Sequence, residues 1–345
     1  MNIGEFQIDR SSSGQQGAME APLLDVRGLS LRIAGNETPL IRDVSFSVRP
    51  GERVGIVGES GCGKTMTGLS ILRLLPPIGI AVSGQVLFEG EDLFALSPSG
   101  LRAVRGRDIA MIFQEPMSAL DPVFTVGEQI AEAYRAHFAA SATEARARTV
   151  DALAQVGIPA PDKRYSDYPH QLSGGMRQRV MIAMALICSP KLLIADEPTT
   201  ALDVTVQSQI TDLLRDISER TGTALLFITH DLGVVAETCT RVITMYAGEV
   251  VEDAPVDDIL LAPRHPYTSG LLRSLPGLSP RRGRLPFIPG RVPSLAAMPT
   301  GCRFRERCSH AVPACEAYQR MEPAGALHYT RCGRAGELSL MGAVH

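Results

Sequence analysis

The sequence predicts an α/β fold with a parallel central sheet. Between residues 23 and 253, short apolar runs typical of buried strands alternate with segments of helical composition. This alternation favours strands joined by helical crossovers. One strand-like run leads directly into a glycine-rich turn and a helix-like segment. The 345 residues are 45% hydrophobic and 21% charged, a composition typical of a globular protein with a buried core. The length favours two domains.

The first half of the chain supplies strands on both sides of the glycine-rich turn. Residues 45–48 alternate polar and apolar side chains as a half-buried strand does. The helix after the turn should run from 64 to 75, because Pro76 and Pro77 stop it. The strands expected in this half are 23–33, 44–48, 54–57, 84–88 and 108–113.

The second half continues the alternation. Residues 126–157 are rich in Ala, Glu and Arg, which predicts helix, and the prolines at 159 and 161 end that region. Further along we expect helices at 174–187 and 204–220, strands at 192–196 and 224–229, and a hairpin at 241–252 around Gly248.

The pattern changes at Ala254. Prolines recur from Pro255 to Pro299, so this segment is not expected to extend the same sheet in a regular way. We therefore divide the chain into a flexible extension at 1–20, a main domain at 21–253 with a helical part at about 115–188, and an irregular region at 254–345.

Charge and hydropathy argue against two classes of function. A formal net charge of −3 gives no basic face for nucleic acid. No apolar run reaches the ~18 residues of a membrane span; the closest, 180–195, is broken at 189–191. Residues 1–20 lack the basic start and apolar run of a signal peptide. We expect the chain to stay in the cytoplasm and to reach a membrane only by docking on another polypeptide.

The glycine-rich turn matches the phosphate-binding pattern G-x-x-x-x-G-K-[ST]. Its residues are Gly58, Glu59, Ser60, Gly61, Cys62, Gly63, Lys64 and Thr65. It follows a strand and opens a helix, the context that supports the motif. The backbone N–H groups and the helix N-terminus would hold the β-phosphate. Lys64 would reach the β- and γ-phosphates, and Thr65 would bind Mg²⁺.

Polar residues follow three other apolar strands. Asp196 ends the strand at 192–196 and would face the glycine-rich turn, where it can orient Mg²⁺. Glu197 comes next and is the candidate general base for a water beyond the γ-phosphate; the alternative is two solvated acids at a strand exit. His230 and Gln114 end two further strands. Each could reach the γ-phosphate region, or Mg²⁺ in the case of Gln114, and each could instead be structural.

Ser173, Gly174 and Gly175 stand at the start of the helix expected at 174–187. A helix N-terminus offers free N–H groups to an anion. The motif at 58–65 already supplies one phosphate-binding site. A second phosphate-binding site at Ser173 therefore suggests that two chains share ATP.

These motifs together resemble the ATP-binding cassette (ABC) ATPases. In order, 58–65 looks like Walker A, Gln114 the Q-loop, 172–176 the signature, 192–197 Walker B, 201–203 the D-loop and His230 the switch histidine. The resemblance implies a P-loop NTPase core with an antiparallel β subdomain and a helical subdomain. It also implies a head-to-tail dimer, in which Ser173 and Gly175 contact the partner's ATP and Asp203 reaches across. One departure is Ile33, which stands where the family often has an aromatic residue for adenine.

Three further segments narrow the resemblance to the oligopeptide/dipeptide importer ATPases. They are 115–122 after Gln114, Arg264-His265-Pro266-Tyr267-Thr268, and Pro289-Gly290-Arg291-Val292-Pro293 before Gly301-Cys302-Arg303-Phe304. The implied partners are a homologous ATPase chain, with a homodimer as the alternative, two transmembrane permeases and an extracytoplasmic solute-binding protein. The implied location is the cytoplasmic face of the inner membrane. Nickel or glutathione could replace peptide as the solute. A soluble ATPase acting on nucleic acid or ribosomes is the remote alternative.

Four cysteines, Cys302, Cys308, Cys315 and Cys332, lie close together near the end of the chain. In a reducing compartment such a cluster favours metal binding over disulfides. The spacing leaves zinc, an iron–sulfur cluster or free thiols open, and His310 or His328 could join a zinc site. The resemblance implies a [4Fe–4S] cluster, because some peptide-importer ATPases carry one in this extension.

Overall fold

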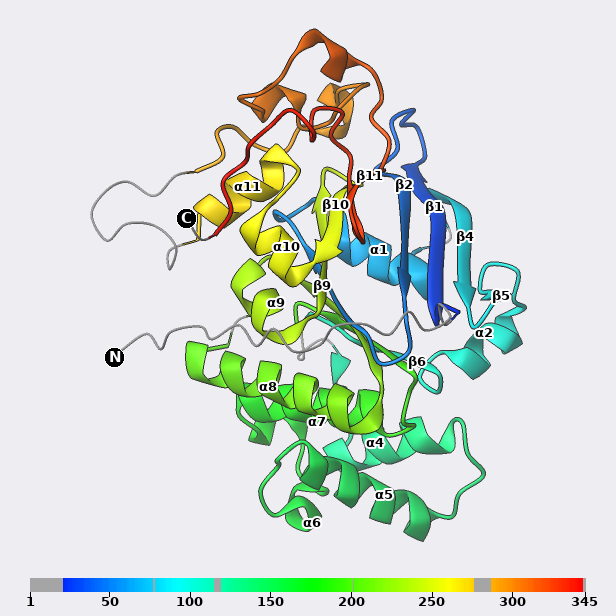
Figure 1. Ribbon diagram of the computed structural model, residues 1–345. Helices are drawn as coiled ribbons and strands as arrows, with labels where there is room; N and C mark the ends of the chain where they lie inside the picture. The colour runs from blue at the N-terminus through cyan, green and yellow to red at the C-terminus, as the bar shows by residue number, and fades with distance from the viewer. Residues whose placement is uncertain (1–20, 77, 115–118, 201, 276–286, 344–345) are drawn as a thin grey trace, which may run out of the picture.

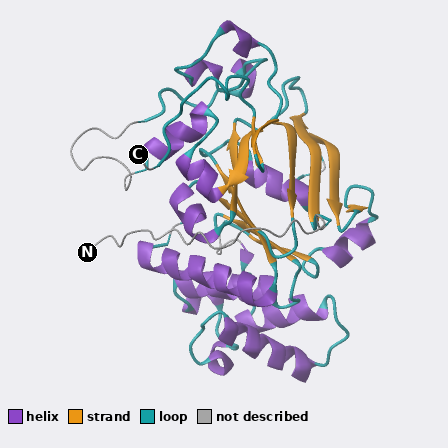
Figure 2. Cartoon of the chain, in the orientation of Figure 1, coloured by secondary structure: helices purple, strands orange, loops and turns teal. Residues whose placement is uncertain are grey.

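In the computed structural model, two β-sheets lie above a layer of helices, and irregular chain covers the opposite end (Figures 1 and 2). The structure describes residues 21–76, 78–114, 119–200, 202–275 and 287–343. The expected flexible extension at 1–20, the segment 115–118 after Gln114, and Ala201 of the D-loop motif lie outside these ranges.

The two sheets differ in their strand pairing. The first is antiparallel in the order β2-β1-β4-β5, formed by β1 Leu24–Ile33, β2 Ile41–Val48, β4 Ile80–Phe88 and β5 Glu91–Asp92. The second has the order β11-β12-β10-β9-β3-β8-β7-β6, formed by β3 Arg53–Val57, β6 Ile109–Ile112, β7 Leu192–Asp196, β8 Ala224–Thr229, β9 Arg241–Tyr246, β10 Glu249–Pro255, β11 Glu322–Gly325 and β12 His328–Thr330. Strands β6, β7, β8, β3 and β9 run parallel, which confirms the predicted parallel core.

Helices lie on both faces of the second sheet, α1 on one and α7 and α8 on the other. The helices in the described part of the chain are α1 Lys64–Ile71, α2 Pro98–Val104, α4 Val126–Arg135, α5 Ala142–Gln155, α6 Pro161–Arg164, α7 Gly174–Leu186, α8 Val204–Thr221, α9 Leu232–Thr238, α10 Val256–Leu261 and α11 Pro266–Arg273. Alternate residues of a strand point to opposite faces. Ile194 of β7 packs in one core with α1 and the antiparallel sheet, and Ala195 packs in the other with α7 and α8. The glycine-rich turn and the Ser173 helix therefore lie on opposite faces of the sheet.

Two helix boundaries differ from the sequence prediction. The first helix ends at Ile71 rather than 75, because Arg73 adopts a positive φ of 51° and leaves the helical path before the prolines. The helical region 126–157 is two helices, and the second begins after Ser141, whose hydroxyl accepts the Glu144 N–H at 3.1 Å. A serine cap of this kind favours a new helix start.

The described residues of the proline-rich segment 256–299 form no strand, as predicted, but the chain beyond this segment extends the sheet. Strand β12 pairs with β10, and β11 pairs with β12 at the sheet edge. Pro323 lies in β11, and an edge strand tolerates proline because one side of it makes no ladder hydrogen bonds. Val256, Ile259 and Leu272 from α10 and α11 also pack in the core that contains α7. The C-terminal region thus continues the main body of the protein.

The hairpin turn between β9 and β10 lies against other backbone. Gly248 has φ +82°, and a Cβ there would stand 1.8 Å from the Leu40 carbonyl oxygen. We expect Gly248→Ala to lower the free energy of unfolding by about 3 kcal/mol. Gly35 also has φ +82° but has open space around it, so Gly35→Ala should cost only about 1 kcal/mol. Urea unfolding of both variants checks this, and equal losses would contradict the close approach.

Candidate active site

The glycine-rich turn joins β3 to α1, and Lys64 makes hydrogen bonds back to the backbone of the turn. Lys64 is 4% exposed, and its Nζ donates to the carbonyl oxygens of Gly58 at 2.8 Å and Glu59 at 3.2 Å. Gly61 and Gly63 have φ values of +79° and +102°, which suit glycine and let the backbone turn tightly. Ser60 and Gly61 are exposed, and Cys62 is buried. Burial raises the pKa of the Cys62 thiol.

The hydroxyl and carboxylate predicted to bind Mg²⁺ lie together. The Thr65 hydroxyl donates to Asp196 Oδ1 at 3.1 Å. Burial raises the pKa of Asp196 to about 6; the Thr65 hydrogen bond opposes the rise and Glu197 adds to it. A hydroxyl beside a carboxylate is an oxygen donor set of the kind that Mg²⁺ prefers, so these residues fit the ion.

Glu197 lies at the centre of the remaining predicted residues. Gln114 Nε2 donates to Glu197 Oε2 at 3.2 Å, and His230 Nδ1 lies 3.4 Å from Glu197 Oε1. The Thr200 hydroxyl also donates to Oε2, at 2.8 Å; Thr200 is not among the residues predicted from the sequence. Glu197 has φ +44°, a left-handed conformation that residues other than glycine adopt uncommonly. Three strand ends therefore bring Gln114, Glu197 and His230 together.

The Ser173 segment is built as an exposed helix N-terminus. The Ser173 hydroxyl accepts the Met176 N–H at 3.4 Å, and Ser173 and Gly174 are exposed. A Cβ on Gly175 would meet Val206 of α8 at 2.9 Å. Asp203, also exposed, caps α8 by accepting the Val206 N–H at 3.0 Å. The fold does not bring this segment to the loop at 58–65, because α1 and α7 lie on opposite faces of the sheet.

The four late cysteines line one small cavity. Cys302, Cys315 and Cys332 also line a neighbouring cavity of about 260 Å³. Burial raises the pKa of Cys302 to about 11, and the nearby thiols add to it. Among the described residues, no group of three or more His, Cys, Asp or Glu side chains is arranged to hold a single metal ion. His328 lies elsewhere, with Nε2 2.7 Å from the Glu252 carboxylate.

Matches to family models and to related proteins show to which family the chain belongs. A model described as "ABC transporter" matches residues 41–200, and one described as "Oligopeptide/dipeptide transporter, C-terminal region" matches 251–315. A probable peptide ABC transporter ATP-binding protein, y4tR of Sinorhizobium fredii, is 53% identical over 324 residues, covering 92% of this chain and 96% of the relative. The chain belongs to the ABC transporter family. A putative peptide import ATP-binding protein of Brucella ovis is 50% identical over 335 residues, covering 92% of this chain and 98% of the relative.

Solved structures of ABC proteins share the fold of this ABC ATPase. The cassette MJ0796, in a dimeric post-hydrolysis state bound to ADP and Pi, gives a TM-score of 0.60 at 29% identity, covering 68% of this chain and 98% of that one. The protein cbiO1 of Clostridium perfringens, part of the ABC transporter complex cbiONQ, gives a TM-score of 0.60 at 28% identity. The match covers 70% of this chain and 91% of that one. Family membership implies ATP binding with Mg²⁺ and ATP hydrolysis. No helix in the described part of this ABC ATPase is long and apolar enough to span a membrane.

Proposed function

We propose that this ABC ATPase powers uptake of dipeptides and oligopeptides across the cytoplasmic membrane. The main support is that peptide-import relatives match 92% of the chain and that the peptide-transporter model matches residues 251–315. It would act at the cytoplasmic face of the inner membrane with two transmembrane permeases, an extracytoplasmic solute-binding protein and a homologous ATPase chain. ATP binding closes the ATPase pair, hydrolysis reopens it, and the permeases convert that motion into alternating access.

In the proposed hydrolysis step, a water molecule attacks the γ-phosphorus of ATP. Glu197 orients the water and accepts its proton as the bond to the β–γ bridging oxygen breaks, which gives ADP and phosphate. Lys64 neutralises charge on the phosphates. Thr65, Asp196 and Gln114 would hold Mg²⁺, which neutralises further charge. The contacts of Gln114 and His230 with Glu197 let both residues respond to the γ-phosphate.

Uptake assays test this function. Cells whose own copy of the gene carries Glu197→Gln should lose uptake of labelled dipeptides and tripeptides. Cells with Glu219→Gln, a change at an exposed ion pair with Arg53, should keep it. Loss of nickel or glutathione uptake with peptide uptake intact would move the function to that solute. Unchanged uptake of all three, with the protein recovered on ribosomes, would favour the soluble alternative.

We also propose that Cys302, Cys308, Cys315 and Cys332 hold a [4Fe–4S] cluster. Four thiols around one cavity are the right number and kind of donor. Zinc is the alternative, because thiolates bind it as well. Protein purified without oxygen should be brown and contain about four iron and four sulfide per chain, and Cys315→Ser should lose the iron. A colourless protein, or one that holds only zinc, would contradict the cluster.

A further inference from the structure

Two side chains from the C-terminal region hold one residue of the phosphate-binding loop. The Glu59 backbone N–H donates to the Tyr267 hydroxyl oxygen at 2.8 Å. The Arg307 guanidinium donates to both oxygens of the Glu59 carboxylate, at 2.7 and 3.0 Å. The Glu59 carbonyl oxygen accepts from Lys64 Nζ at 3.2 Å. The N–H, the carbonyl and the side chain of Glu59 are therefore all engaged, and the N–H is turned toward the C-terminal region.

Arg307 and Tyr267 are themselves held firmly. The Arg307 side chain is only 6% exposed, and its Nε donates to the Pro289 carbonyl oxygen at 2.7 Å. Tyr267 is fully buried and packs against Tyr246 and Phe304, with ring centroids 4.7 and 5.3 Å away. Burial alone would lower the pKa of Arg307, but its hydrogen bonds to Glu59 and Tyr246 raise it above its ordinary value. A bidentate arginine–carboxylate pair in such surroundings fixes geometry as well as charge.

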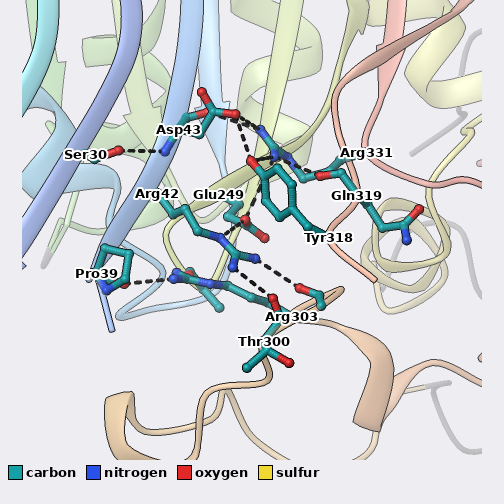
Figure 3. Close-up of polar contacts among 12 residues, drawn as sticks. Ser30, Pro39, Arg42, Asp43, Glu249, Thr300, Arg303, Tyr318, Gln319 and Arg331 are labelled. Atoms are coloured by element: carbon teal, nitrogen blue, oxygen red, sulfur yellow. Dashed lines mark hydrogen bonds and ion pairs between the residues drawn. The ribbon is translucent and has the colours of Figure 1, made fainter. Parts of the chain in front are cut away.

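A second connection reaches the loop through the β9–β10 turn. The Gly248 N–H donates to the Cys62 carbonyl oxygen at 2.7 Å. Arg303, 2% exposed, donates to the carbonyl oxygens of Ala247 and Pro39. Figure 3 shows Arg303 reaching Pro39 beside Arg42, which donates to the Thr300 carbonyl oxygen. Contacts independent of Arg307 therefore also join the C-terminal region to β2 and to the β9–β10 turn.

We propose that Arg307 and Tyr267 are positioning residues for ATP. By fixing Glu59, they hold the backbone from Gly58 to Lys64 in the shape that receives the phosphates. The inference rests on the proposed role of that loop in ATP binding. Since placing binding groups in advance lowers the cost of ordering them on binding, loss of the Arg307–Glu59 pair should weaken ATP binding more than it changes the chemical step.

ATP affinity and steady-state hydrolysis separate this role from a merely structural one. Arg307→Ala should raise the Kd and KM for ATP by about tenfold while kcat at saturating ATP stays within about twofold. Arg307→Lys should recover part of the affinity, because lysine keeps the charge without the two-pronged geometry. Adding Glu59→Gln to Arg307→Ala should cost little more, because both changes break the same pair. Arg305→Ala is the matched control: Arg305 lies in the same segment and faces the exposed Glu316 at 3.6 Å.

The outcomes are distinct. Wild-type affinity in Arg307→Ala, or an equal loss in Arg305→Ala, overturns the inference and leaves the proposed function intact. A wild-type chain that does not bind ATP overturns both. If Arg307→Ala does not fold, Tyr267→Phe removes only the hydroxyl that accepts the Glu59 N–H. It should raise the Kd for ATP severalfold while the protein still folds, with the urea midpoint lowered by the loss of one hydrogen bond; an unchanged Kd overturns the inference.

Discussion

Replacing Glu197 by glutamine is expected to lower the rate of ATP hydrolysis by about 10²–10⁴-fold and to leave ATP binding in place. Glutamine keeps the size of the side chain and can still face Gln114, His230 and Thr200, the three groups in contact with Glu197. It cannot take a proton from the attacking water. The bound state should therefore persist, because the step that ends it has been slowed.

Phosphate release and binding of a fluorescent ATP analogue, measured on the same preparation, check this expectation. Glu219→Gln makes the same chemical change at the exposed partner of Arg53 and should match the wild type in both measurements. Hydrolysis by Glu197→Gln within a few-fold of the wild-type rate would remove Glu197 as the general base.

Replacing Ser173 by arginine should have a comparable effect from the opposite face of the sheet. If each ATP lies between the loop at 58–65 of one chain and the Ser173 helix of another, a large cation there displaces a group that would contact the γ-phosphate. Loss of one such stabilising contact costs about 10²–10³-fold in rate. ATP binding to the unpaired chain should not change, because the fold of a single chain keeps α7 away from that loop.

The parallel core and the hydrolytic residues could be predicted because their signals are local. The apolar run before Asp196 and Glu197 identifies a buried strand, and the carboxyl ends of parallel strands meet at one edge of the sheet. That rule suffices to bring Gln114, Glu197 and His230 together, as the structure does. Thr200 could not be predicted because threonines after a strand, such as Thr199 and Thr200, show no distinctive pattern.

The contacts of the C-terminal region with the loop at 58–65 could not be predicted, because they join residues more than 200 positions apart. Nothing local marks Arg307 or Tyr267 as partners of Glu59. The same holds for β12, whose three residues are too few to show alternation and which forms a strand because β10 offers it an edge. The prolines at 255–299 predict a segment that does not extend the sheet, and β11 and β12 lie beyond that segment in the sequence.

The most direct test of the shared ATP site is single-turnover hydrolysis by Ser173→Arg beside Ser141→Arg, both with ATP bound. Both serines cap a helix by accepting an N–H, from Met176 and Glu144 respectively, so the two variants lose the same kind of cap. When this chain pairs with a homologous chain, Lys64→Ala is added to this chain. It stops hydrolysis at the ATP site whose phosphate-binding loop this chain supplies, so that only the site facing residue 173 is measured. A site shared between two chains predicts near wild-type hydrolysis for Ser141→Arg and a loss of at least about 100-fold for Ser173→Arg at unchanged ATP affinity. Equal hydrolysis by the two variants would show that a single chain completes the site and would rule out sharing.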